Sequence, residues 1–192
     1  MNITSKVLAV NNTPVEFLSE MMGDEDPDVR LEVARRIPII HLPKMMEDPV
    51  WGVRYWVASR IEPSHLPKMM KDEHDCVLRV VARRIDLEYL QEMLQYPHWY
   101  VHCEIAQRIS VDSLPEMMWN THPGVRAQVA IRISVDQLPK MMVDPDSVVR
   151  NCVAAKIESR FLTAMMMREP AKNVWSSINS RIISRYTTTS KG

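Results

Sequence analysis

Apolar residues recur along the chain with a period of 24 residues. Each repeat begins with a leucine, which we number position 0, and these leucines are Leu18, Leu42, Leu66, Leu90, Leu114, Leu138 and Leu162. Position 3 is methionine in all seven repeats, while position 16 is alanine and position 19 is isoleucine in the first six. The seventh repeat keeps these apolar positions if one residue is inserted between Met166 and Pro170. Such a fixed period is typical of a repeat architecture.

Two helical segments are expected in every repeat. Positions 11, 15 and 19 are apolar and stand four residues apart, which places them on one face of an α-helix of about three turns. An Asp-Pro pair before this segment, as at Asp48-Pro49 and Asp144-Pro145, predicts where that helix starts. The segment from the leucine to the paired methionines has room for only six or seven residues. We expect this segment to form a short helix, of either α or 3₁₀ geometry.

One repeat of this kind cannot bury its apolar face alone, whereas stacked repeats form a continuous core. The sequence therefore predicts an all-α solenoid of seven repeats over residues 18–186. Residues 1–17 are expected to form an N-terminal cap, and residues 187–192 a disordered tail.

The repeat unit L-x-x-M-M-x-D-P-x-x-x-V-R-x-x-V-A-x-R-I resembles the leucine-rich repeat variant family. The resemblance implies a right-handed superhelix of alternating α and 3₁₀ helices, related to HEAT and armadillo solenoids. It also implies a ladder of hydrogen bonds between repeats, formed by the Asp at position 6 and the Arg at position 12. The residues concerned are Asp24/Arg30, Asp48/Arg54, Asp144/Arg150 and, as a weaker version, Asn120/Arg126. Leu78, Tyr96 and His102 interrupt this pattern in the middle of the chain.

The same resemblance suggests a class of partner. Members of the family are encoded among nitrogen-fixation genes, and the chain is loosely similar to nitrogenase-associated accessory factors, which suggests a nitrogenase component as the partner. Some members carry a cysteine-rich iron–sulfur module before the repeats. No cysteine precedes Cys76 in this chain, so that cofactor is not implied.

The composition of the chain disfavours several classes of protein. The chain has 192 residues with 24 basic and 24 acidic side chains, so it lacks the overall positive charge of a typical nucleic-acid-binding or membrane-surface protein. Its longest apolar runs, such as Val7 to Val10, are four residues long and predict neither a membrane span nor a signal peptide. Three cysteines fit no disulfide framework. A cytoplasmic protein with free thiols is expected.

No catalytic motif is present, so we expect neither enzymatic activity nor a small-molecule substrate. His74, His98 and His122 share position 8, but repeats about 10 Å apart would keep them too far from one another to bind one metal ion. His98 and His102 offer only two ligands. The paired methionines fit core packing better than copper binding. The sequence therefore predicts no metal and no cofactor.

Position 18 is Arg in five repeats and Lys156 in the sixth. Such a column can be structural, covering the edge of the core and pairing with carboxylates of an adjacent repeat, or it can form a basic stripe for an acidic partner or a phosphate backbone. Its regularity favours the structural role, because residues that bind a partner vary between repeats.

Residues that vary between repeats are a better guide to a binding surface. The outward positions of the longer helix carry aromatic side chains in repeats 2 and 4 only. With an arginine between them, they form the predicted partner-binding set: Trp51, Tyr55, Trp56, Arg79, Trp99 and Tyr100. Such aromatics are enriched in protein interfaces. For Trp56, packing against a neighbouring repeat is the alternative.

The leading functional hypothesis is a non-catalytic protein-binding module that acts as an accessory, assembly or stabilising factor for a larger protein. The alternative is a nucleic-acid-binding solenoid, in which Arg79, Arg83 and Arg84 contact phosphates and the aromatic side chains stack on bases. The net charge of zero disfavours this alternative.

Overall fold

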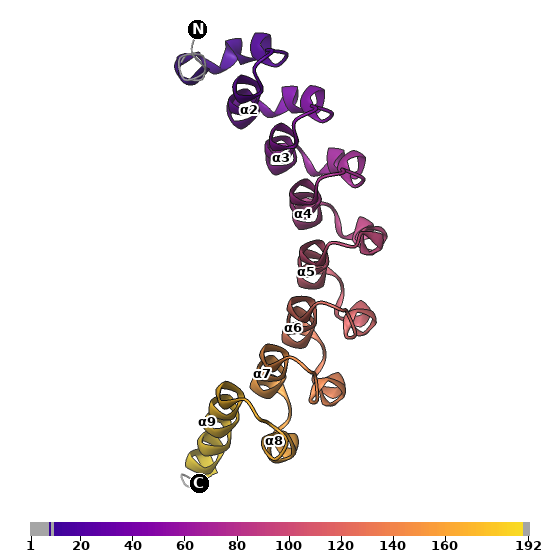
Figure 1. Cartoon of the computed structure of the whole chain (residues 1–192), viewed down its shortest axis with the longest axis vertical. Helices are drawn as coiled ribbons and strands as arrows, with labels where there is room; N and C mark the ends of the chain where they lie inside the picture. Colours follow the sequence, from indigo (N-terminus) through magenta and orange to yellow (C-terminus); the bar gives the residue numbers. More distant parts are fainter. Residues whose placement is uncertain (1–7, 9, 190–192) are drawn as a thin grey trace. The chain divides into compact units, whose positions relative to one another are not determined.

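The computed structural model describes residue 8 and residues 10–189, with side chains as far as residue 182. Residues 1–7 and 9 of the predicted cap, and 190–192 of the predicted tail, lie outside the described residues. Within the described part, every regular element is a helix (Figure 1), which confirms the all-α class.

The longer helix of each of the first six repeats is an α-helix of ten residues. Along the described chain these helices begin 24 residues apart: α2 (Pro27–Arg36), α3 (Trp51–Arg60), α4 (Asp75–Arg84), α5 (Trp99–Arg108), α6 (Pro123–Arg132) and α7 (Ser147–Lys156). Where Asp-Pro stands at positions 6 and 7, the helix starts two residues later than this pair predicts, so α3 begins at Trp51 and not at Pro49, and α7 begins at Ser147 and not at Pro145. The reason is that the carboxylate of Asp48 accepts a hydrogen bond from the backbone N–H of Val50 at 2.9 Å, which forms a turn ahead of α3. In the first repeat, α2 begins at Pro27, directly after its N-cap Asp26.

The shorter helix has 3₁₀ geometry in the first six repeats. These helices are η1 (Val15–Met21), η2 (Ile39–Met45), η3 (Pro63–Met69), η6 (Val111–Met117) and η7 (Val135–Met141), while repeat 4 divides its segment into η4 (Leu87–Tyr89) and η5 (Glu92–Gln95). The seventh repeat departs from this pattern. Its first helix, α8 (Ser159–Met166), is α-helical rather than 3₁₀.

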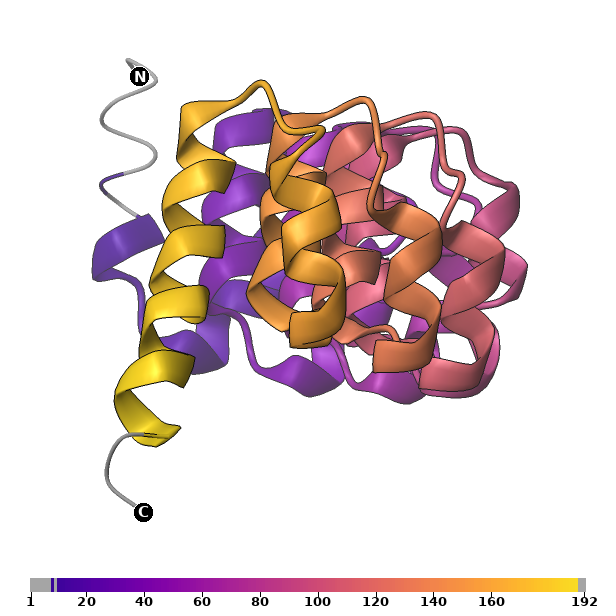
Figure 2. The same cartoon turned by 90° about the horizontal axis from the view of Figure 1, so that it is seen from below.

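The last helix, α9 (Lys172–Thr189), is the longest described element (Figure 2). It passes the predicted end of the solenoid at residue 186, so residues 187–189 are helical where the sequence predicts a disordered tail. From Lys172 onward no proline or glycine occurs before Gly192, and therefore nothing in this stretch stops the helix early.

The chain divides into two compact units, Met1–Val101 and His102–Gly192. In the first unit, α2, α3 and α4 pack one against the next as one layer, and the 3₁₀ helices form a second layer beside them (Figure 1). The second unit repeats this arrangement, with α6 against α7, α7 against α9, and α8 against α9. Consecutive packing of helix pairs is the defining property of an α-solenoid.

The predicted core positions are buried. The leucine at position 0 is buried in every repeat, from Leu18 to Leu162, and so are the alanines at position 16 in the first six repeats. The methionine at position 3 is buried in repeats 2 to 7, while that at position 4 is buried only in Met70 and Met118. The methionine pairs therefore contribute their first member to the core, as the packing interpretation expects.

Ala106 at position 16 of α5 offers a direct test of this packing, since its side chain is fully buried. We expect Ala106→Leu to destabilise the protein by about 1 to 3 kcal/mol, because the added carbon atoms have no space in a close-packed core. Chemical denaturation measures the effect. Equal denaturant midpoints for the variant and the wild type would show that this position tolerates a larger side chain.

Candidate functional site

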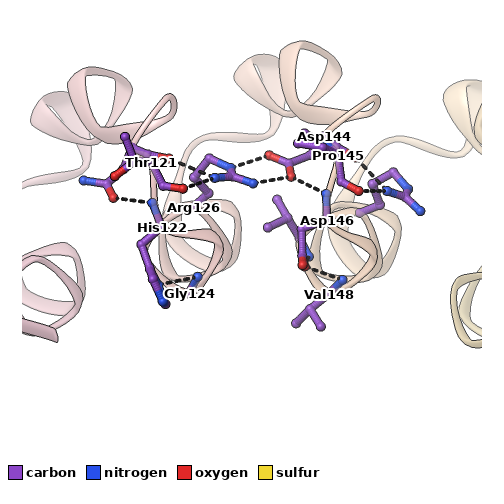
Figure 3. A network of polar contacts seen from close by, with 11 residues as sticks. Thr121, His122, Gly124, Arg126, Asp144, Pro145, Asp146 and Val148 are labelled. Atoms are coloured by element: carbon purple, nitrogen blue, oxygen red, sulfur yellow. Dashed lines mark hydrogen bonds and ion pairs between the residues drawn. The ribbon is translucent and has the colours of Figure 1, made fainter. Parts of the chain in front are cut away.

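A ladder of arginine–carboxylate pairs links the turns between the two layers (Figure 3). In the second unit, Arg126 donates from Nε and Nη2 to the two carboxylate oxygens of Asp144, at 2.7 and 2.8 Å. Its Nη1 donates to the backbone oxygen of Asn120 at 2.9 Å. Arg126 thus pairs with the Asp of the following repeat and also holds the turn of its own repeat. Both side chains of this pair are buried.

The same pairing occurs in the first unit, where Nε of Arg30 lies 2.7 Å from Asp48, and Nε of Arg54 lies 2.7 Å from Asp72. Hydrogen bonding to these carboxylates raises the pKa of both guanidinium groups. The ladder between repeats that the resemblance implied is therefore present in both units.

The ladder changes where its sequence pattern changes. Leu78 is buried in the apolar core at the position of the arginine, and Nδ1 of His102 lies 3.0 Å from Nδ2 of Asn120 in place of an ion pair. Between the sixth and seventh repeats, Arg150 pairs with Glu169 at 2.6 Å, and this pairing lowers the pKa of the Glu169 carboxyl. Glu169, whose side chain is longer than that of Asp and which follows the inserted residue, thus replaces the Asp of the ladder in the seventh repeat.

Two of the predicted binding residues are exposed tryptophans in the first unit. Trp51 and Trp99 open α3 and α5, and each keeps 45% of its surface accessible. The ring of Trp51 stacks on the imidazole of His74, with centroids 4.1 Å apart and the planes 4° from parallel. Trp99 meets the ring of half-buried Tyr100 edge-on, at 5.3 Å between centroids.

Two residues at the start of α4 join these tryptophans into one surface. His74 carries the stack with Trp51, and the next residue, Asp75, accepts a hydrogen bond from the hydroxyl of Tyr100. We call Trp51, His74, Asp75, Trp99 and Tyr100 the aromatic surface. The predicted partner-binding set did not include His74 and Asp75, although these residues stand at positions 8 and 9 of the repeat between those of Trp51 and Trp99. This place in the repeat register is the signal that points to them.

The other predicted binding residues lie differently. Tyr55 and Trp56 are half-buried and meet edge-on, with centroids 5.6 Å apart. The guanidinium of Arg35, in the preceding repeat, lies 4.9 Å from the ring of Trp56, which is a cation–π contact. Trp56 thus packs against its neighbouring repeat, which is the alternative considered for it. Arg79 is exposed on α4.

Comparison with solved structures identifies the repeat. The chain superimposes on a structure described as a leucine-rich repeat variant with a novel repetitive structural motif, with a TM-score of 0.82 and 31% sequence identity over 91% of this chain and 74% of that chain. The chain belongs to the leucine-rich repeat variant family. No family model matches the sequence, and no curated protein matches it.

The Arg and Lys side chains at position 18 of this leucine-rich repeat variant, which we call the basic column, have a structural role. Their partners differ from the expected carboxylates. Arg60 donates to the backbone oxygens of Ala34 and Ile37, both at 2.7 Å, and Arg132 donates to that of Ala106 at 2.8 Å. These oxygens lie at the C-terminal end of the α-helix in the preceding repeat, where carbonyl groups need donors. Burial lowers the pKa of Arg60. The column therefore joins consecutive repeats.

Among the described residues, one group of three possible metal ligands lies close together, namely His74, Asp75 and Cys76 at the start of α4. Three of their possible ligand atoms already accept hydrogen bonds within the protein. Nδ1 of His74 and one oxygen of Asp75 accept from the backbone N–H of Cys76, at 3.3 and 2.7 Å, and the other oxygen of Asp75 accepts from Tyr100. Desolvation and the Asp75 carboxylate raise the pKa of the Cys76 thiol, which disfavours the thiolate that a metal needs. The group caps the helix and orients the aromatic surface.

The described helices include none with both the length and the apolar character to cross a lipid bilayer.

Proposed function

We propose that this leucine-rich repeat variant is a non-catalytic module that binds a larger protein through its aromatic surface. A repeat fold of this family suggests a protein-interaction module. The observation that supports this surface is the exposure of Trp51 and Trp99 at position 9, where other repeats carry Pro27, Asp75, Pro123 or Ser147. The fold does not require tryptophan there, so its presence in two repeats calls for a role outside the repeat stack.

The contacts around these rings suit a binding role. Trp51 is held against His74, and Tyr100 is held by Asp75 and by the edge of Trp99. Ordering exposed side chains on binding costs conformational entropy, and rings already fixed by neighbours avoid part of that cost. Large aromatic side chains that are exposed and pre-oriented resemble the residues that contribute most to protein interfaces.

The more specific part of the proposal concerns the partner. We propose that the protein serves as an accessory, assembly or stabilising factor for its partner. The family resemblance makes a nitrogenase component the first partner to test. Affinity capture of the tagged chain from its native cells, followed by mass spectrometry, identifies the partner for the measurements below.

We expect Trp51→Ala and Trp99→Ala to weaken binding to the captured partner by about 2 kcal/mol or more each, since exposed aromatic anchors contribute most of the binding energy of many interfaces. Both substitutions should change the free energy of unfolding by no more than about 0.5 kcal/mol, because each residue keeps 45% of its surface accessible outside the core. Calorimetry with the purified partner and chemical denaturation measure the two quantities on the same variants.

Trp56 provides the matched control, because it is a tryptophan of the same unit that packs beneath Arg35. Trp56→Ala is expected to lower stability and to leave affinity nearly unchanged. Unchanged affinity in Trp51→Ala and Trp99→Ala would contradict the proposal. An affinity that falls steeply with salt for a captured nucleic acid would favour the nucleic-acid alternative instead.

A further inference from the structure

Equivalent grooves lie between the short helices of consecutive repeats, and we compare one groove from each unit. The groove of the first unit, between repeats 2 and 3, has a volume of about 720 Å³ and includes Glu47, Lys68 and Lys71 in its lining. The groove of the second unit, between repeats 5 and 6, has a volume of about 310 Å³ and is lined at the same repeat positions by Trp119, Lys140 and Val143. Each groove also contains one ladder pair, Arg54–Asp72 or Arg126–Asp144.

The walls of the second groove are apolar and accessible. Trp119 and Val143, which both stand at position 5, are 68% and 63% exposed, and Met167 at this position in the last repeat is 84% exposed. The first four repeats have Gly23, Glu47, Lys71 and Gln95 there, in that order. Position 5 thus accepts small, charged or polar residues in the same fold. Large apolar side chains at this position are consequently not required by the packing of the repeats.

The charge of the second groove is positive. Arg126 and Asp144 neutralise each other, with the arginine donating two hydrogen bonds to the carboxylate. Lys140 is the remaining charged residue of the lining, and its ammonium group donates to the neutral side-chain oxygen of Gln137 at 2.6 Å. Asp136, near Lys140 on η7, does not line the groove. An occupant that brings a carboxylate next to an apolar side chain complements this lining.

We propose that the groove between Trp119 and Val143 binds an acidic segment of a partner protein, with a large apolar side chain between the two walls and an adjacent carboxylate facing Lys140. Its volume suits one large side chain with its backbone. This site lies in the second unit on the short-helix layer, and it shares no residue with the aromatic surface of the first unit. The proposal does not depend on that surface being used.

A peptide selection tests this assignment. The 192-residue chain is immobilised and used to select binders from a phage-displayed library of random 12-residue peptides, and enriched peptides are synthesised for affinity measurement. We expect enriched sequences to place Trp, Phe or Leu beside Asp or Glu. W119E and V143K give the second groove the side chains that the first groove carries at position 5, and each is expected to weaken peptide affinity at least tenfold. K140E should weaken binding of the acidic peptides by a similar factor.

The controls separate loss of the site from loss of the fold. W119E and V143K should melt at the temperature of the wild type, because repeats 2 and 3 carry these residues at the same position. W51A, on the aromatic surface, should bind the selected peptides with unchanged affinity. If W51A abolishes binding of the captured partner, the function proposed above is supported. That result does not depend on the outcome of the peptide selection.

Three outcomes would overturn the groove proposal. The first is that no peptide is enriched, and the second is that the affinity of enriched peptides is unchanged in W119E and V143K. The third is that sedimentation velocity shows wild-type self-association that W119E removes, since a second copy of the chain would then occupy the groove.

Discussion

Replacing Arg126 with alanine is expected to lower the free energy of unfolding by about 3 to 5 kcal/mol. Asp144 is 7% exposed, and its two carboxylate oxygens accept from Nε and Nη2 of Arg126. Without the arginine, a buried negative charge loses its partner, and this is far more costly than the loss of an exposed ion pair. The backbone oxygen of Asn120 loses a donor as well. Urea denaturation at neutral pH measures the change.

Arg79→Ala is the matched control, because Arg79 is an exposed arginine on an α-helix of the same length. We expect it to change stability by no more than about 0.5 kcal/mol. If Arg126→Ala also falls within that range, the ladder pair does not contribute to stability as its burial and geometry imply.

Leu114→Ala should destabilise the second unit by about 2 to 5 kcal/mol. Leu114 occupies position 0 of η6 and has no accessible surface. Its truncation removes apolar contacts in the core and leaves a cavity where the side chain was. The measurement is again the free energy of unfolding in denaturant.

Leu87→Ala is the comparison for this variant. Leu87 also lies in a 3₁₀ helix, η4, but 63% of its surface is exposed, so its truncation should cost about 0.5 kcal/mol or less. Equal losses of stability in the two variants would mean that position 0 is not the core anchor of the repeat.

The fold was predictable because the repeat supplies several independent copies of the same information. A single apolar residue at position 15 would be weak evidence for a helix. The same position is valine in several repeats, and this recurrence identifies the buried face of the helix; the valines are Val33, Val57, Val81 and Val129. The helix starts were less predictable, because Asp48 can cap a helix directly or form a turn before it. Only the structure shows that it bonds to the N–H of Val50.

The candidate site was predictable in part. Trp51 and Trp99 were expected on the outer face of the helix, and their helical register is sufficient to place them there. The stack on His74 and the bond from Tyr100 to Asp75 connect different repeats. They depend on side-chain rotamers and on the spacing between helices, and neither quantity can be read from periodicity.

The Trp119 groove was not predicted, because it lies beside the short helices and the outward positions of the longer helix do not line it. Position 5 follows the short helix, and the exposure of Trp119 and Val143 depends on how that helix turns toward the next α-helix. Comparing the repeats at position 5 shows the change from polar to apolar residues, but not that the two side chains line one groove.

The basic column binds main-chain oxygens, and this affects how a repeat chain of this kind can evolve. Arg60 and Arg132 bond to main-chain oxygens of the preceding repeat, at Ala34 and Ala106 respectively. Every repeat offers these oxygens whatever its side chains are. A 24-residue unit can therefore be duplicated, deleted or exchanged by recombination without a compensating substitution in its neighbour at this contact, which leaves outward positions such as those of Trp51 and Trp119 free to diverge.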